Sequence, residues 1–87
     1  MLSEAELKKL RWLCSARSMR EMDVLLGNFF ETRFSLLNEV EAAAFAELAE
    51  QHDMVLWALI TGQRECTDPV QAEVIAKLKN AQLDLGK

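Results

Sequence analysis

The spacing of the apolar residues between positions 22 and 30 constrains this chain more than any other feature. They recur at intervals of three and four residues, as Met22, Leu25, Leu26, Phe29 and Phe30. Because an α-helix makes one turn every 3.6 residues, this spacing places all of them on one helical face. So broad an apolar face predicts a helix at the centre of a core.

Four further helices are predicted from residues that begin and end helices. Ser-x-x-Glu at Ser3, repeated at Ser18, is the pattern of a capping box, and Asn38 with Glu41 forms a third. Asp53 is the predicted cap of the fourth helix, and Pro69 stands at the first position of the fifth. The five predicted helices run from Ser3 to about Ala16, from Ser18 through Phe30, from Asn38 to about Gln51, from Asp53 to Gly62, and from Thr67 or Asp68 to Leu85.

Composition supports an all-α fold. Three glycines, one proline and no tyrosine provide few of the turn signals that an all-β chain needs. A length of 87 residues and a hydrophobic content of 51% are enough for one modest core. We therefore expect residues 1–87 to form a single domain, a compact five-helix bundle. Gly27 interrupts the second helix, which favours close approach of a neighbouring backbone.

Several functional classes are disfavoured by the distribution of charge and apolar residues. Residues 34–68 contain one arginine against seven acids, and this charge would repel a nucleic-acid backbone. The apolar run from Met54 to Ile60 is too short to span a membrane. Cys14 and Cys66 have no partner motif and are expected to be reduced thiols. With no targeting pattern at the N-terminus, we expect a cytoplasmic protein.

No catalytic group and no metal site is predicted. The only histidine, His52, follows the third helix, where a cation suits the negative end of the helix dipole. The acidic residues of the third helix are expected to form a solvated face. An enzyme using Cys14 or Cys66 as nucleophile remains the weaker alternative. The sequence therefore favours a protein that binds another protein.

The stretch from Arg17 to Asp23 is the most unusual in the chain, and two interpretations are open. In the structural one, Ser18 caps the second helix, Glu21 reaches back to it, and the arginines are solvated. In the functional one, Arg17 lies just outside the helix and presents a forked donor to a carboxylate of a partner. Composition alone favours the structural interpretation.

This stretch resembles the signature of the succinate dehydrogenase assembly factors, the small FAD assembly factors also called flavinators. Their Arg-Gly-x-x-Glu motif, with an Asp after one further residue, corresponds to Arg17-Ser18-Met19-Arg20-Glu21-Met22-Asp23. The continuation over residues 24–31 is similar to the family's second helix, and Asp53, Trp57 and Gly62 are similar to its fourth. The resemblance runs from about residue 10 to residue 62.

The resemblance implies a five-helix protein that binds the flavoprotein subunit of succinate dehydrogenase or fumarate reductase. It implies that the helper promotes covalent attachment of FAD to a histidine of that subunit, so FAD belongs to the client and is not bound stably here. We expect a monomer when free, with Trp57 in the core. The implied partner-binding residues are Arg17, Ser18, Met19, Arg20, Glu21 and Asp23.

Two positions depart from the family pattern. Ala16 stands where a first arginine is usual, and Ser18 replaces the motif glycine. Serine is harmless as a cap, but it would weaken binding if the position needs a positive φ or close approach of the partner. We expect Arg17→Ala and Glu21→Ala each to leave the protein folded and to weaken capture of the flavoprotein. A regulatory interaction module of antitoxin type is the alternative function.

Overall fold

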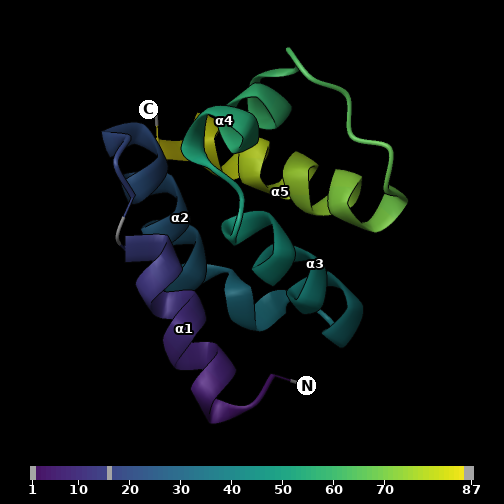
Figure 1. Ribbon diagram of the computed structural model, residues 1–87. Helices are drawn as coiled ribbons and strands as arrows, with labels where there is room; N and C mark the ends of the chain where they lie inside the picture. Colours follow the sequence, from purple (N-terminus) through teal and green to yellow (C-terminus); the bar gives the residue numbers. More distant parts are fainter. Residues whose placement is uncertain (1, 16, 86–87) are drawn as a thin grey trace.

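The part of the chain that the structure describes forms five α-helices, which Figure 1 colours in the order of the sequence. The computed structural model describes residues 2–15 and 17–85, with only the backbone of residues 84 and 85. Over these residues all regular structure is helical, so the all-α prediction is confirmed. The predicted boundary at Ala16 lies outside the described residues. The helices are α1 (Glu4–Ser15), α2 (Arg20–Thr32), α3 (Glu39–Ala49), α4 (Asp53–Thr61) and α5 (Pro69–Leu85).

Helix α2 supplies the centre of the core, as its apolar spacing predicts. Four of its five predicted core residues are buried, and Phe30 is half-buried against them. Burying a side chain of this size contributes roughly 1.5–3 kcal/mol relative to leaving it exposed, so this one face contributes much of the driving force for folding. The buried residues of α2 are Met22, Leu25, Leu26 and Phe29.

A short 3₁₀ helix, η1 (Phe34–Leu36), follows α2 and has no counterpart in the sequence prediction. It turns the Phe34 ring toward the core, where it lies 5.1 Å from the Phe30 ring and 5.7 Å from the Phe45 ring, between centroids. Phe45 in turn lies 5.1 Å from Phe29. These distances are typical of favourable aromatic pairs, so the η1 segment attaches α2 to α3 through aromatic contacts.

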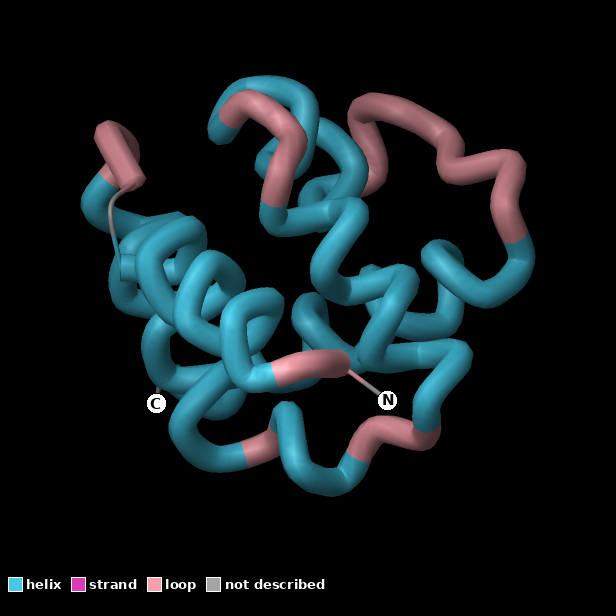
Figure 2. Tube along the Cα trace, turned by 60° about the horizontal axis from the view of Figure 1, so that its bottom comes forward, coloured by secondary structure: helices cyan, strands magenta, loops and turns pink. Residues whose placement is uncertain are grey.

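Helices α1 and α5 both pack against α2. Helix α1 contacts α2 and α3, while α5 contacts α2, α3 and α4 (Figure 1). The predicted apolar stripe of α5 is buried at Val74, Leu78 and Ala81, and the side chain of Leu85 lies outside the described part. The connection between α4 and α5 is the long loop that arches over one side of the molecule in Figure 2. None of the helices in residues 2–15 and 17–85 combines the length and apolar character that a membrane crossing requires.

Most predicted helix ends are found in the structure. Ser3 and Asn38 both form capping boxes, in which the side-chain oxygen and the glutamate three residues later each accept a backbone N–H. Asp68 caps α5 ahead of Pro69. Helix α4 ends at Gly62 with a φ of 83°, the left-handed conformation that glycine adopts without strain.

Gly27 does face a neighbouring backbone, as expected, but it is not required there. A Cβ atom at this position would lie 4.0 Å from the carbonyl oxygen of Cys14 in α1, an ordinary van der Waals contact.

Candidate functional site

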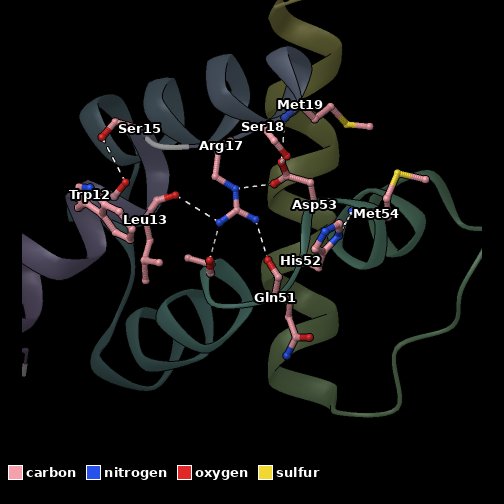
Figure 3. Close-up of polar contacts among 11 residues, drawn as sticks. Trp12, Leu13, Ser15, Arg17, Ser18, Met19, Gln51, His52, Asp53 and Met54 are labelled. Carbon is pink, nitrogen blue, oxygen red and sulfur yellow. Dashed lines mark hydrogen bonds and ion pairs between the residues drawn. The ribbon is translucent and has the colours of Figure 1, made fainter.

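The corner between α1 and α2 carries the residues that the sequence singles out, and it is built around one ion pair. Arg17 Nε donates to Asp53 Oδ1 at 2.6 Å, and the two side chains are only 7% and 6% exposed. Figure 3 shows the guanidinium lying between the corner and the connection that joins α3 to α4. The pair therefore ties two segments that are 36 residues apart in the sequence.

Every nitrogen of the Arg17 guanidinium is used inside the protein. Besides the ion pair, Nη1 donates to the carbonyls of Leu13 and Ala49, and Nη2 donates to the carbonyl of Gln51 (Figure 3). The expectation that Arg17 presents its fork to a partner is therefore wrong. The last carbonyl oxygens of a helix have no N–H partner within the helix, and this applies at the ends of α1 and α3. A planar guanidinium can donate hydrogen bonds to several such carbonyls at once.

The Asp53 carboxylate is equally occupied. Its Oδ2 accepts the Ser18 hydroxyl and the Met19 N–H, both at 2.9 Å, in addition to the Arg17 bond at Oδ1. Burial would raise the pKa of Asp53, but the hydrogen bonds from Met19, Ser18 and Arg17 outweigh it and hold the pKa below its ordinary value. Asp53 is therefore a buried, ionised carboxylate. Its predicted role as the cap of α4 is wrong.

The ion pair lies where four helix ends meet. Arg17 contacts carbonyls of the last turn of α1 and of the C-terminal end of α3, where helix dipoles are negative. Asp53 is the first residue of α4 and accepts the N–H of Met19, the residue that precedes α2, so the carboxylate lies where dipoles are positive. Each charge is thus stabilised by the other and by two helix ends.

Ser18 does not cap α2, which corrects the second predicted capping box. Helix α2 begins at Arg20 after Met19, and no side chain caps it, because the Ser18 hydroxyl donates to Asp53 instead. No described residue other than glycine has a positive φ, so serine replaces the family's glycine here without backbone strain.

His52 is the cap that the sequence assigned to Asp53. Its Nδ1 accepts the N–H of Met54 at 3.2 Å at the start of α4. The prediction that His52 serves the end of α3 is therefore corrected, since its ring acts as an acceptor at the N-terminus of the next helix.

Four of the predicted partner-binding residues have side chains that the ion pair does not use. Arg20 and Glu21 are exposed, and Met19 and Asp23 are half-buried. Within residues 2–15 and 17–85, the side chains of Arg20, Glu21 and Asp23 form no hydrogen bond or ion pair. Met54, which sequence reasoning missed, is 63% exposed at the start of α4. Figure 3 shows Met19 and Met54 projecting to the same side, away from the ion pair.

The described residues offer little chemistry of their own. They contain no cluster of three or more His, Cys, Asp or Glu that could hold a metal ion. Burial raises the pKa of the Cys14 thiol to about 12, against a smaller lowering by the Arg17 charge. Because the thiolate is the nucleophile, Cys14 is inert near neutral pH. Trp57 is half-buried against the core, in line with the expectation that it packs there.

Comparison with known proteins identifies a family whose match includes this corner. Residues 8–82 match the family described as flavinator of succinate dehydrogenase. A Xylella fastidiosa protein named FAD assembly factor SdhE is 35% identical over 75 residues, covering 86% of this chain and 76% of that protein. Its namesake in Aliivibrio fischeri is 32% identical over 78 residues, 90% of both chains. A Coxiella burnetii namesake is 40% identical over 55 residues, 63% of this chain and 66% of that protein. The chain belongs to the flavinator of succinate dehydrogenase family.

Proposed function

We propose that this protein is an assembly factor that binds the flavoprotein subunit of succinate dehydrogenase and promotes covalent attachment of FAD to it. The observation that carries the proposal is the match to the flavinator family over residues 8–82, a range that includes the whole corner between α1 and α2. The relatives described above are named FAD assembly factors, which favours this function over a regulatory module of antitoxin type.

The geometry of the corner supports a binding role. The buried pair of Arg17 and Asp53 fixes the backbone, while Arg20 and Glu21 expose opposite charges at the first turn of α2. A fixed backbone that displays uncommitted polar side chains loses little conformational entropy on binding. We propose that Ser18, Met19, Arg20, Glu21 and Asp23, together with Met54 at the start of α4, contact the client. In this proposal Arg17 acts from beneath this surface.

The proposed mechanism is positioning by binding energy. A helper that prefers one conformation of the flavoprotein subunit shifts its population toward that conformation, in which the subunit's own groups react with the flavin. The inert Cys14 thiol is consistent with a helper that supplies no reacting group. In this proposal FAD is held by the client, and the free helper is a monomer.

Reconstitution tests the proposal directly. Purified flavoprotein subunit lacking covalent flavin is incubated with FAD, with and without this protein, and flavin fluorescence is measured on the subunit after denaturing electrophoresis. We expect covalent flavin to accumulate faster with the protein present. Equal fluorescence in both reactions would contradict the proposed function. Running the flavoprotein subunit of fumarate reductase in parallel identifies the preferred client.

A further inference from the structure

One carboxylate holds three consecutive residues of the corner. Asp53 accepts hydrogen bonds from Arg17 Nε, Ser18 Oγ and Met19 N, at 2.6, 2.9 and 2.9 Å. These three residues lie directly before α2, and Asp53 belongs to neither α1 nor α2. The conformation of residues 17–19 therefore depends on a group from α4.

Helix α2 has no side-chain cap of its own that would fix the residues before it. In a capping box, a glutamate at the third helical position accepts the N–H of the residue that precedes the helix. Here that position is Met22, which is apolar and fully buried. Asp53 accepts the N–H of Met19 in its place, as a carboxylate from a distant part of the chain.

We propose that Asp53 is a positioning residue for client binding: it fixes the backbone of Ser18 and Met19 in the conformation that the flavoprotein subunit recognises. The inference rests on the proposed function and deepens it. Asp53 is 6% exposed and lies beneath the surface formed by the exposed residues of the corner, so it acts through them and not by touching the client.

The expected effect is on affinity. Without Asp53, the Met19 N–H and the Ser18 hydroxyl lose their acceptor, and residues 17–19 sample other conformations before binding. Only the fraction of the protein in the conformation that binds the client is then competent. If that fraction falls about tenfold, the apparent dissociation constant rises about tenfold. A residue that acts on binding through its neighbours changes the free energy of binding modestly, so we expect Asp53→Asn to weaken binding on the order of tenfold.

A stability-matched control separates positioning from general destabilisation. Val74 in α5 is fully buried, and the bonds that hold the corner do not include it, so Val74→Ala lowers stability through a core cavity alone. Binding of wild type, Asp53→Asn and Val74→Ala to the purified flavoprotein subunit is measured by isothermal titration calorimetry, at a temperature where all are folded. Asp53→Asn should bind about tenfold more weakly, and Val74→Ala should bind like wild type.

A second variant covers the case in which Asp53→Asn does not fold around an unpaired arginine. Arg17→Met combined with Asp53→Leu replaces the ion pair by apolar groups of similar size, which is often neutral for stability. This double variant should fold and still bind weakly. Amide hydrogen exchange in free wild type adds a readout that needs no variant, since the Met19 N–H should be protected.

The outcomes separate the proposed function from the positioning role of Asp53. Wild type that fails to bind the flavoprotein subunit overturns the proposed function and the positioning role together. Wild-type-like binding by the corner variants overturns only the positioning role, and so does an equal loss in Val74→Ala. Rapid exchange of the Met19 N–H in free wild type also overturns it, because the bond to Asp53 would then not be maintained.

Discussion

Arg17 and Asp53 form an ion pair with 2.6 Å between Nε and Oδ1, at a place where both side chains are almost fully buried. Removing two charges from water is costly, and their mutual attraction repays the cost only when further hydrogen bonds satisfy both groups. Here three carbonyls and two additional donors do so. Such a pair is better suited to fixing one conformation of the corner than to adding net stability.

Removing one partner should be far more damaging than removing both. Arg17→Ala leaves Asp53 buried without its counter-ion, so we expect a loss of about 3–5 kcal/mol in the free energy of unfolding, measured by urea denaturation. This replaces the expectation that Arg17→Ala leaves the fold intact. Lys9→Ala is the control, because its pair with Glu50 is exposed and contributes at most about 1 kcal/mol. Equal losses in both variants would contradict the buried pair.

Stability should fall at acidic pH through Asp53. Its folded-state pKa lies below the ordinary value of 3.8, so its contribution is fully present above that value and is lost as the pH falls through the folded pKa. The pKa of Glu6 is also lowered, by its bonds with Ser3, so the measurement uses a Glu6→Gln background. Urea midpoints from about pH 6 down to about pH 2.5 should fall steeply with Asp53 present and less steeply in Asp53→Asn. Parallel curves would exclude Asp53 as the source.

Local patterns predicted those parts of the fold whose partners are close in sequence. The apolar spacing of α2 identified its buried face because helical periodicity is set within one segment. The capping boxes at Ser3 and Asn38 formed because donor and acceptor lie three residues apart. The η1 helix was missed because Phe34 is drawn into a cluster with Phe45, a contact made only by the tertiary fold.

The hydrogen bonds of the corner could not be predicted, although Ser18 begins the same Ser-x-x-Glu pattern as Ser3. At Ser18 the same Ser-x-x-Glu spacing is present, but the hydroxyl bonds Asp53, 35 residues away. Sequence spacing does not reveal that the ends of four helices converge there. The inward direction of Arg17 follows from that convergence, since the carbonyls of Ala49 and Gln51 attract its guanidinium. The exposure of Met54 likewise depends on the tertiary fold.

Gly27 and Gly62 should respond to alanine in opposite directions. A Cβ fits at Gly27 within α2, so Gly27→Ala should raise the free energy of unfolding by about 0.5–1 kcal/mol. Gly62 has a φ of 83°, so Gly62→Ala should lower it by about 1–2 kcal/mol. Thermal or urea unfolding measures both. Destabilisation by Gly27→Ala would show that the two helices pack more closely than a Cβ allows.

The two thiols should differ sharply in reactivity. Cys14 is buried and its pKa is raised to about 12, whereas Cys66 is partly exposed. We expect one equivalent of thiol to react quickly with Ellman's reagent at neutral pH, and the second only after unfolding in urea, because the reagent needs an accessible thiolate. In Cys66→Ser the fast phase should disappear. A fast phase that persists in this variant would contradict the burial of Cys14.

Glu21 tests whether the exposed part of the corner contacts the client. Its side chain lies in the first turn of α2, where its charge contributes no more than about 1 kcal/mol to stability, so Glu21→Gln should remain folded. If the carboxylate accepts a charge-assisted hydrogen bond from the flavoprotein subunit, its loss should raise the dissociation constant about tenfold or more. Glu47→Gln, at an exposed glutamate of α3, removes the same charge outside the corner and should bind normally. If the two variants bind alike, either both weakly or both normally, the first turn of α2 does not recognise the client through Glu21. Because Glu21, unlike Arg17, can be changed without disturbing the ion pair, this comparison separates contact with the client from support of the fold.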